Sequence, residues 1–350
     1  MKIKDVRSMK LTMQLKSRSY DIILKAGCLA NLHQFTNVAN RKVFVLTDSG
    51  VPAEYAQTVA AQCPDSTVYT IPRGEGSKCL KVYGQVLQAM LAFGMDRKDL
   101  LVSVGGGVVG DLGGFCAASY MRGIDFVNCP TTVLSQVDSS IGGKTAVDLG
   151  DTKNIVGAFW QPKLVIVDPD TLSTLPRRHF INGLAEAIKA GLLADPELFS
   201  IFEKEDVDDR IGDIICRSLR FKKSIVEQDE TEQGMRKALN FGHTIGHGIE
   251  AVKGIKGRRT TGLFHGECVA LGMLPMIESK ALQKRVRGVY RRLGLPTRTA
   301  YDKEKVLAEM LHDKKAQDGQ ITIIKVPGLG CWRAETIPVE GLRPLLGMED

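Results

Sequence analysis

Three histidines and a glutamate carry the residue types that could bind a catalytic metal: His243, His247, His265 and Glu186. Neutral imidazoles and a carboxylate are ligands that zinc accepts while one coordination position stays open for a substrate oxygen. His243 and His247 would share one face of a helix, but such a pair is also common without a metal. A zinc protease of the His-Glu-x-x-His class is excluded, because Thr244 stands where that motif has its glutamate. The residues indicate a catalytic metal without fixing which histidines bind it.

A glycine-rich turn follows a short apolar run in the first half of the chain. Residues 100–104 (LLVSV) are typical of a buried parallel strand and lead directly into GGGVVGD at 105–111. Glycines at such a junction let backbone amides approach a phosphate at a helix N-terminus, although a tight turn has the same composition. The spacing departs from the G-x-G-x-x-G fingerprint of dinucleotide-binding folds. An earlier strand ends in Asp48, which could hold a nucleotide ribose or cap the next helix.

Composition predicts an ordinary globular protein. The chain has 350 residues, of which 43% are hydrophobic and 25% charged, enough for two domains. No window is apolar enough to span a membrane, and the first ten residues are too charged for a signal peptide, so we expect a cytoplasmic protein. The eight cysteines contain no Cys-x-x-Cys pair, which argues against a disulfide framework and a cysteine zinc site.

The net charge of +7 would suit an anionic partner. The basic segments 253–259 and 284–287 lack interleaved aromatic residues, so we interpret them as solvated surface and expect no nucleic acid partner. Isolated basic residues beside glycines and small polar residues would instead suit a small, multiply anionic substrate such as a phosphorylated sugar acid. These residues are Arg122, Lys144, Lys153, Lys189, Lys222 and Arg236.

The character of the sequence changes near residue 176. Before it, strand-like runs alternate with helix-like segments, which is the βαβ pattern of a parallel sheet; the runs are 42–46, 100–104, 126–129 and 164–167, and the helix-like segments include 52–61 and 80–93. After it, helical periodicity dominates, for example over 213–227 and 268–282. We expect an α/β domain over 1–176 and an all-α domain over 177–350.

A series of sequence blocks together resembles the 3-dehydroquinate synthase family. They occur in the family's order and cover most of the chain: 105–115, 130–132, 135–146, 153–154, 183–189, 239–247 and 265–267. The resemblance implies a Rossmann-like NAD-binding α/β domain, a helical metal-binding domain and an active site in the cleft between them. It also implies conversion of 3-deoxy-D-arabino-heptulosonate 7-phosphate (DAHP) to 3-dehydroquinate and phosphate in the shikimate pathway, which leads to chorismate and the aromatic amino acids. The implied steps are transient oxidation by NAD, phosphate elimination, reduction and intramolecular aldol cyclisation.

The same resemblance implies roles for individual residues. The ligands of a divalent metal, Zn²⁺ or Co²⁺, would be Glu186, His243 and His265. The substrate would contact Lys144, Asn154, Lys189, Lys222, Arg236, Asn240, His247 and one of Lys314 and Lys315, and Arg122 would reach the phosphate in the neighbouring subunit of a homodimer. NAD would contact Asp48, Glu75, Lys78, Gly106, Gly107, Val108, Asp111, Thr131, Thr132, Asp138, Lys144, Lys153 and Thr174.

Alternatives stay open in the sequence. Other sugar phosphate cyclases share this fold, metal and NAD but form different carbocycles, and metal-dependent glycerol-type dehydrogenases share the architecture but are net oxidoreductases. The set of Lys144, Lys222, Arg236 and Asn240 resembles that of the dehydroquinate-forming branch. For single residues, Lys189 could lie on a solvated helix surface, and His247 could hydrogen-bond to the metal site instead of binding substrate.

Overall fold

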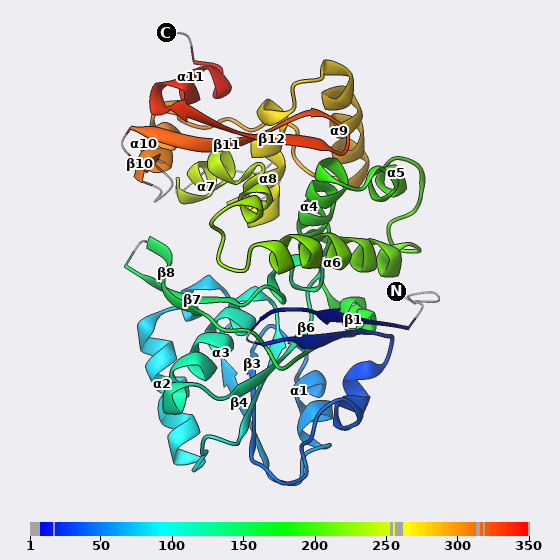
Figure 1. Cartoon of the computed structure of the whole chain (residues 1–350), viewed down its shortest axis with the longest axis vertical. Helices are drawn as coiled ribbons and strands as arrows, with labels where there is room; N and C mark the ends of the chain where they lie inside the picture. Colours follow the sequence, from blue (N-terminus) through cyan, green and yellow to red (C-terminus); the bar gives the residue numbers. More distant parts are fainter. Residues whose placement is uncertain are drawn as a thin grey trace. The chain divides into compact units, whose positions relative to one another are not determined.

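Two compact units make up the chain. The computed structural model describes residues 8–16, 18–150, 152–252, 255, 262–312, 316–317 and 319–348. One unit comprises Met1–Pro176 with Ile211–Glu230, and the other comprises Arg177–Arg210 with Thr231–Asp350 (Figure 1). The chain therefore changes unit at residue 176, where the sequence changes character, but it returns to the first unit for one further segment.

The first unit is built on a seven-stranded sheet. Its strands follow the order β1-β2-β9-β6-β5-β3-β4, with bounds Met9–Met13 (β1), Tyr20–Leu24 (β2), Val43–Asp48 (β3), Ser66–Ile71 (β4), Leu100–Gly105 (β5), Asp125–Pro130 (β6) and Leu164–Val167 (β9). Pairing is parallel throughout except between β1 and β2. The carboxyl ends of β3, β5 and β6 therefore meet along one edge of the sheet.

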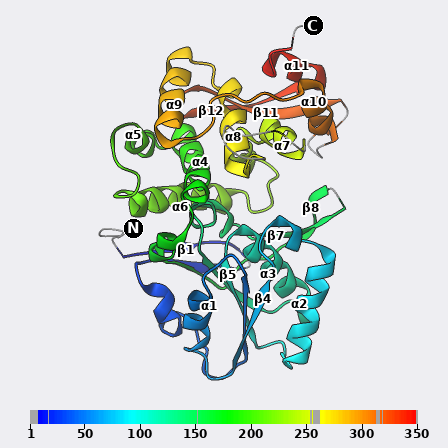
Figure 2. The same cartoon turned by 180° about the vertical axis from the view of Figure 1, so that it is seen from behind.

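Helices cover both faces of this sheet (Figures 1 and 2). Val43 and Val45 pack with helix α1 (Ala53–Ala60) and the 3-10 helix η1 (Cys28–Gln34) on one face. Phe44 and Leu46 pack with α2 (Leu80–Ala92) and α3 (Gly107–Ser119) on the other. Because successive side chains of a strand point to opposite faces, a strand covered on both sides is apolar along its whole length. The expected α/β domain with a parallel sheet is confirmed.

Helix α6 (Ile211–Gln228) is the segment that returns to the first unit. It packs against β1 and against the short helical turn η4 (Ser135–Ser139). The backbone N–H of Gln14, just after β1, donates to Glu227 Oε1 at 2.6 Å. Helix α6 is helical, as its periodicity predicted, but the residues that it packs against lie in the first unit. The second unit is therefore not one continuous segment over 177–350.

The second unit is mainly helical. Its helices are α4 (Arg177–Leu193), α5 (Pro196–Lys204), α7 (His243–Ala251), α8 (His265–Met273), α9 (Lys280–Leu293), α10 (Lys303–His312) and α11 (Leu342–Leu345). A three-stranded antiparallel sheet of β10 (Ala316–Gln317), β11 (Gln320–Gly328) and β12 (Cys331–Pro338) accompanies them. The helical character is as expected, but the unit is not all α, because the β-branched run from Ile321 to Val326 forms a strand. Among the described residues, no helix is long and apolar enough to cross a membrane.

A proline interrupts the helix expected over 268–282. Helix α8 ends at Met273, a 3-10 turn η7 (Leu274–Met276) follows, and α9 begins only at Lys280. Pro275 has no amide hydrogen to donate, so it cannot continue the helical ladder. Ile277 is extended and bridges to Val326 of β11 instead. The expectation of one continuous helix was wrong at this point.

Candidate functional site

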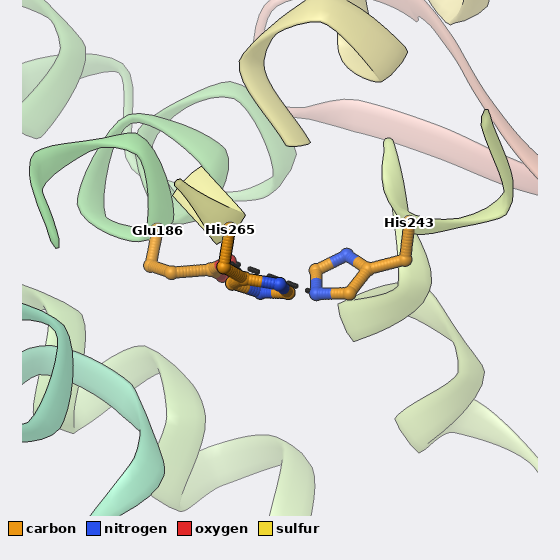
Figure 3. Close-up of side chains that lie close together, drawn as sticks. All are labelled: Glu186, His243 and His265. Carbon is orange, nitrogen blue, oxygen red and sulfur yellow. Dashed lines mark ion pairs between the residues drawn. The ribbon is translucent and has the colours of Figure 1, made fainter. Parts of the chain in front are cut away.

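Glu186, His243 and His265 converge from three helices of the second unit, α4, α7 and α8 (Figure 3). Glu186 Oε1 lies 3.6 Å from His243 Nε2 and 3.5 Å from His265 Nε2. Two ligand atoms bound at about 2.1 Å to one tetrahedral metal are about 3.4 Å apart. The three side chains therefore have the spacing of a divalent metal site.

The electrostatics of this cluster favour a cation. Glu186 is buried, and in the described part of the chain no donor makes a hydrogen bond of ordinary geometry to its Oε1. Burial raises the pKa of Glu186, but Lys189 and His265 outweigh burial and lower that pKa to about 2. Burial lowers the pKa of His265, but Glu186 and Glu250 outweigh it and raise that pKa to about 10. The acidic groups thus stabilise positive charge beside the histidines, which a divalent metal would provide.

Lys189 is buried next to Glu186, His243 and His265. It forms an ion pair with Glu186, one turn earlier on α4, and its Nζ donates to the backbone carbonyl of Leu239 at 2.9 Å. This burial excludes the alternative that Lys189 lies on a solvated helix surface.

Close helix packing brings the two candidate ligands His243 and His265 together. Helices α7 and α8 lie side by side in both views (Figures 1 and 2). A Cβ atom on Gly272 of α8 would lie 2.1 Å from the backbone oxygen of Gly242, which precedes His243. A larger residue in place of Gly242 or Gly272 would push the two helices apart and would separate His243 from His265.

Two side chains fix the first turn of α8, which begins at His265. Asn182 Oδ1 accepts hydrogen bonds from the backbone N–H groups of Gly266, at 2.7 Å, and Glu267, at 3.3 Å. The Glu267 carboxylate accepts from the backbone N–H of Phe264 at 2.8 Å and pairs with Arg178. Glu267 of the His-Gly-Glu block thus caps the helix. Asn182 was not predicted, and its position beside the 183–189 block is the only signal that the sequence offers.

His247 lies at the same cluster. Its ring centroid is 5.2 Å from that of His243 and 5.9 Å from that of His265. Together with Glu250 and His265 it also forms a second group of potential ligand atoms within 4.8 Å of one another. Its predicted contact with the substrate stays a prediction.

Glu250 was not predicted from the sequence. Its Oε2 lies 3.0 Å from His265 Nδ1, the imidazole nitrogen that does not face Glu186. Glu250 follows His247 by three residues on α7, so helical periodicity could have placed it beside His247 but not beside His265.

The other expected substrate residues of the second unit lie around the 3-10 helix η6 (Met235–Asn240). Arg236 is 1% exposed, so its guanidinium is held inside the unit. Asn240 Nδ2 donates to Glu232 Oε1 at 2.7 Å, and Glu232 has a left-handed φ of 64°. Such a conformation is unusual for a non-glycine residue and is found often at functional sites. Glu232 was missed by the sequence analysis, and Lys314 and Lys315 lie outside the described residues.

The expected substrate residues of the first unit are less enclosed. Arg122, Lys144 and Asn154 are exposed, and Arg122 and Asn154 have positive φ values of 65° and 54°. Lys144 and Asn154 lie on the hairpin of β7 (Lys144–Leu149) and β8 (Thr152–Phe159). Lys222 is the buried member of this set, and it contacts Asp138.

Several expected NAD residues meet at the carboxyl edge of the sheet. The β5–α3 junction brings Gly106 and Gly107 to the start of α3, whose first turn has no side-chain cap. A Cβ on Gly106 would lie 3.0 Å from Thr132, which follows the neighbouring strand β6. Uncapped amides at a helix N-terminus beyond parallel strands can bind a phosphate. Val108 lies in this first turn of α3. The backbone N–H of Thr131 donates to the backbone carbonyl of Gly105 at 2.9 Å.

An ion-pair network joins three more of the expected NAD residues. Lys78 Nζ lies 2.8 Å from Asp111 Oδ2 and 3.4 Å from Glu75 Oε1. Burial opposes the charge of Lys78, but Asp111 and Glu75 outweigh burial and raise its pKa. Ion pairs therefore hold together Glu75, Lys78 and Asp111, which the family resemblance assigns to NAD.

The remaining expected NAD residues are more dispersed. Asp48 ends β3 and accepts from the backbone N–H of Gly50 at 2.7 Å, and the N-cap of α1 is Pro52. Asp48 therefore fixes a turn and does not act as a helix N-cap, the alternative left open above. Thr174 Oγ1 lies 2.9 Å from the Tyr55 hydroxyl, and Lys153 is exposed on β8.

Comparisons with known proteins give the same family over nearly the whole chain. A family model described as the N-terminal part of 3-dehydroquinate synthase matches residues 68–182, and one described as its C-terminal part matches residues 183–316. The 3-dehydroquinate synthase of Streptococcus suis (strain 05ZYH33) is 38% identical over 360 residues, which cover 97% of this chain and 99% of the relative.

Two solved structures have the same fold as this chain. A 2-deoxy-scyllo-inosose synthase complexed with carbaglucose-6-phosphate, NAD+ and Co²⁺ has a TM-score of 0.85 at 22% identity, over 97% of this chain and 99% of the other. The 2-epi-5-epi-valiolone synthase ValA from Streptomyces hygroscopicus subsp. jinggangensis 5008, with NAD+ and Zn²⁺ bound, has a TM-score of 0.81 at 26% identity, over 95% and 98% of the two chains.

Proposed function

The chain belongs to the 3-dehydroquinate synthase family, and we propose that it converts DAHP to 3-dehydroquinate and inorganic phosphate. The metal-ligand spacing of Glu186, His243 and His265 is the structural observation that carries the proposal. The curated relative, matched over nearly its full length, supports the same activity.

The proposal includes one divalent metal and NAD. The metal would be held by Glu186, His243 and His265, and Zn²⁺ or Co²⁺ suits this donor set. NAD would lie against the uncapped start of α3, near Gly106 and the Lys78–Asp111 pair. When bound, the two groups would supply polarisation of a substrate hydroxyl and a reversible hydride acceptor.

The basic residues would recognise the substrate's charge. DAHP carries a carboxylate and a phosphate, so its binding needs several cations in fixed positions. Lys189 and Arg236 are buried in the second unit, and Lys222 is buried in the first. Side chains held in this way lose little further freedom when they bind an anion, so they would orient a flexible substrate for elimination and ring closure. Asn240, positioned by Glu232, and His247 would contact its hydroxyl groups.

Another sugar phosphate cyclase activity is the main alternative. The structures of such cyclases resemble this chain at 22% and 26% identity, whereas the dehydroquinate-forming relative is 38% identical. The higher identity supports the dehydroquinate branch. A homodimer, in which Arg122 reaches the neighbouring subunit's substrate, and a cytoplasmic location stay predictions of the sequence.

Phosphate release from DAHP tests the function directly. The protein should release phosphate from DAHP when NAD and Zn²⁺ or Co²⁺ are present, and a chelator should abolish the reaction until metal is added back. The product should be 3-dehydroquinate by mass and by chromatographic comparison with an authentic sample. Release of phosphate from another sugar phosphate, but not from DAHP, would instead support a different cyclase.

A further inference from the structure

We propose that Glu250 is a positioning residue that holds His265 in the tautomer and orientation needed to bind the metal. The inference rests on the metal site of the proposed function and adds to it a residue outside the expected ligand set. It concerns the contact between α7 and α8 within the second unit.

The two ring nitrogens of His265 face different carboxylates. Nε2 lies 3.5 Å from Glu186 Oε1, at the proposed metal site, and Nδ1 lies 3.0 Å from Glu250 Oε2. A neutral imidazole carries one N–H, and an ionised carboxylate can only accept a hydrogen bond. Glu250 therefore favours the tautomer with hydrogen on Nδ1, which leaves the lone pair of Nε2 for a metal. A carboxylate in this position also raises the basicity of the ligand nitrogen.

Helix α7 carries both His243 and Glu250. His243, one of the proposed ligands, and Glu250 are seven residues apart, so they lie on the same face of α7. One helix would thus supply a ligand directly and the acceptor that orients a second ligand. The side chain of Glu250 is 16% exposed, so water competes little for its carboxylate.

A second metal is the competing explanation, because His247, Glu250 and His265 also form a group of potential ligands. In that case His265 would bridge two metals through its two nitrogens. However, the 3.0 Å distance between Nδ1 and Glu250 Oε2 is that of an ordinary hydrogen bond, and it is shorter than the separation of about 3.4 Å between ligands of one tetrahedral metal. The geometry therefore favours one metal and a hydrogen bond.

Metal titration of the full chain tests the role of Glu250. The metal-free wild type, Glu250→Ala, Glu250→Gln and Glu309→Gln would be titrated with Zn²⁺ against a competing chelator. Glu309 is exposed on α10, which packs on α7, so Glu309→Gln removes the same charge without touching His265. We expect one metal per chain in the wild type and in Glu309→Gln with equal affinity. Both Glu250 variants should bind about 10- to 100-fold more weakly.

Two further measurements separate positioning from a general loss of structure. Thermal unfolding of the metal-free proteins shows whether each variant folds, and Glu250→Gln, which keeps the shape of the side chain, decides the question if Glu250→Ala does not fold. The absorption spectrum of bound Co²⁺ should differ between the wild type and the Glu250 variants, because the ligand orientation differs.

The outcomes are distinct. Folded Glu250 variants that bind Zn²⁺ as tightly as Glu309→Gln would overturn the positioning role while leaving the metal site intact. Two metals per chain in the wild type would overturn it in favour of a bridging His265. A wild type that binds no divalent metal would overturn the metal site of the proposed function, and the role of Glu250 with it.

Discussion

Lys222 and Asp138 contact each other at two points. Lys222 Nζ lies 3.0 Å from Asp138 Oδ1 and donates to the Asp138 backbone carbonyl at 2.8 Å. The lysine side chain is 9% exposed, so most of this contact is screened from water. Lys222 is an expected substrate residue and Asp138 an expected NAD residue, so this ion pair links the two sets of residues inside the first unit.

Lys222→Gln should therefore weaken NAD binding as well as turnover. Replacing the lysine removes one cation from beside a partly buried carboxylate, at a cost of about 1–3 kcal/mol. A cost of this size on the cofactor side would raise the Kd for NAD at least about fivefold. The adjacent Lys223, which pairs with Glu227 at 2.7 Å, gives the matched control Lys223→Gln. Fluorescence titration with NAD measures the effect, and equal Kd values for the two variants would contradict the coupling.

His243→Ala and His247→Ala should have different effects. His243 is close enough to Glu186 Oε1 to share a metal with it, so His243→Ala should lose the metal. His247→Ala should keep metal and NAD binding but lose on the order of 100-fold in turnover, because it would remove a proton-transfer or charge-stabilising group. Metal analysis of both purified variants, with steady-state kinetics, measures this. If His247→Ala lost its metal as readily as His243→Ala, the two roles would have to be exchanged.

Turnover should leave no net NADH. In the proposed reaction the hydride removed from DAHP returns to a later intermediate, so NAD acts catalytically. Phosphate should accumulate over many turnovers while absorbance at the nicotinamide wavelength returns to a constant value. NADH formed in proportion to substrate consumed would instead indicate a dehydrogenase of the glycerol type.

Gly266→Ala should weaken metal binding through the backbone. A Cβ at Gly266 would lie 2.0 Å from the backbone oxygen of Asn182, so the first turn of α8, including His265, must shift. We expect a loss of about 1–3 kcal/mol in the free energy of unfolding, together with weaker Zn²⁺ binding. The control is Gly288→Ala in α9, where nothing lies within 4 Å of the added Cβ and alanine favours the helix. Chemical denaturation and Zn²⁺ titration compare the two; equal stability and metal affinity would show that the contact at Gly266 relaxes freely.

The sequence by itself determined the parallel sheet, and its resemblance to a known family supplied the candidate metal ligands. Strand and helix periods are local properties, so the alternating runs before residue 176 predicted the α/β unit. The candidate ligands Glu186, His243 and His265 lie in three of the sequence blocks that carry the family resemblance, and their residue types suit a divalent metal. The break after α8 could also have been predicted, because Pro275 has no N–H to continue the helix. The expectation of one helix over 268–282 was wrong because it followed the apolar periodicity and gave no weight to this proline.

Only the tertiary structure decided which distant residues support that chemistry. Glu250 and His265 are 15 residues apart, and Asn182 and Gly266 are 84 apart, so no local period relates either pair. The return of α6 to the first unit was equally hidden, because an amphipathic helix indicates that one face is buried but not what covers it. The sequence could name candidate ligands because Glu186, His243 and His265 lie in blocks that resemble a known family. It could not name the residues that orient them, because that role depends on the packing of separate helices.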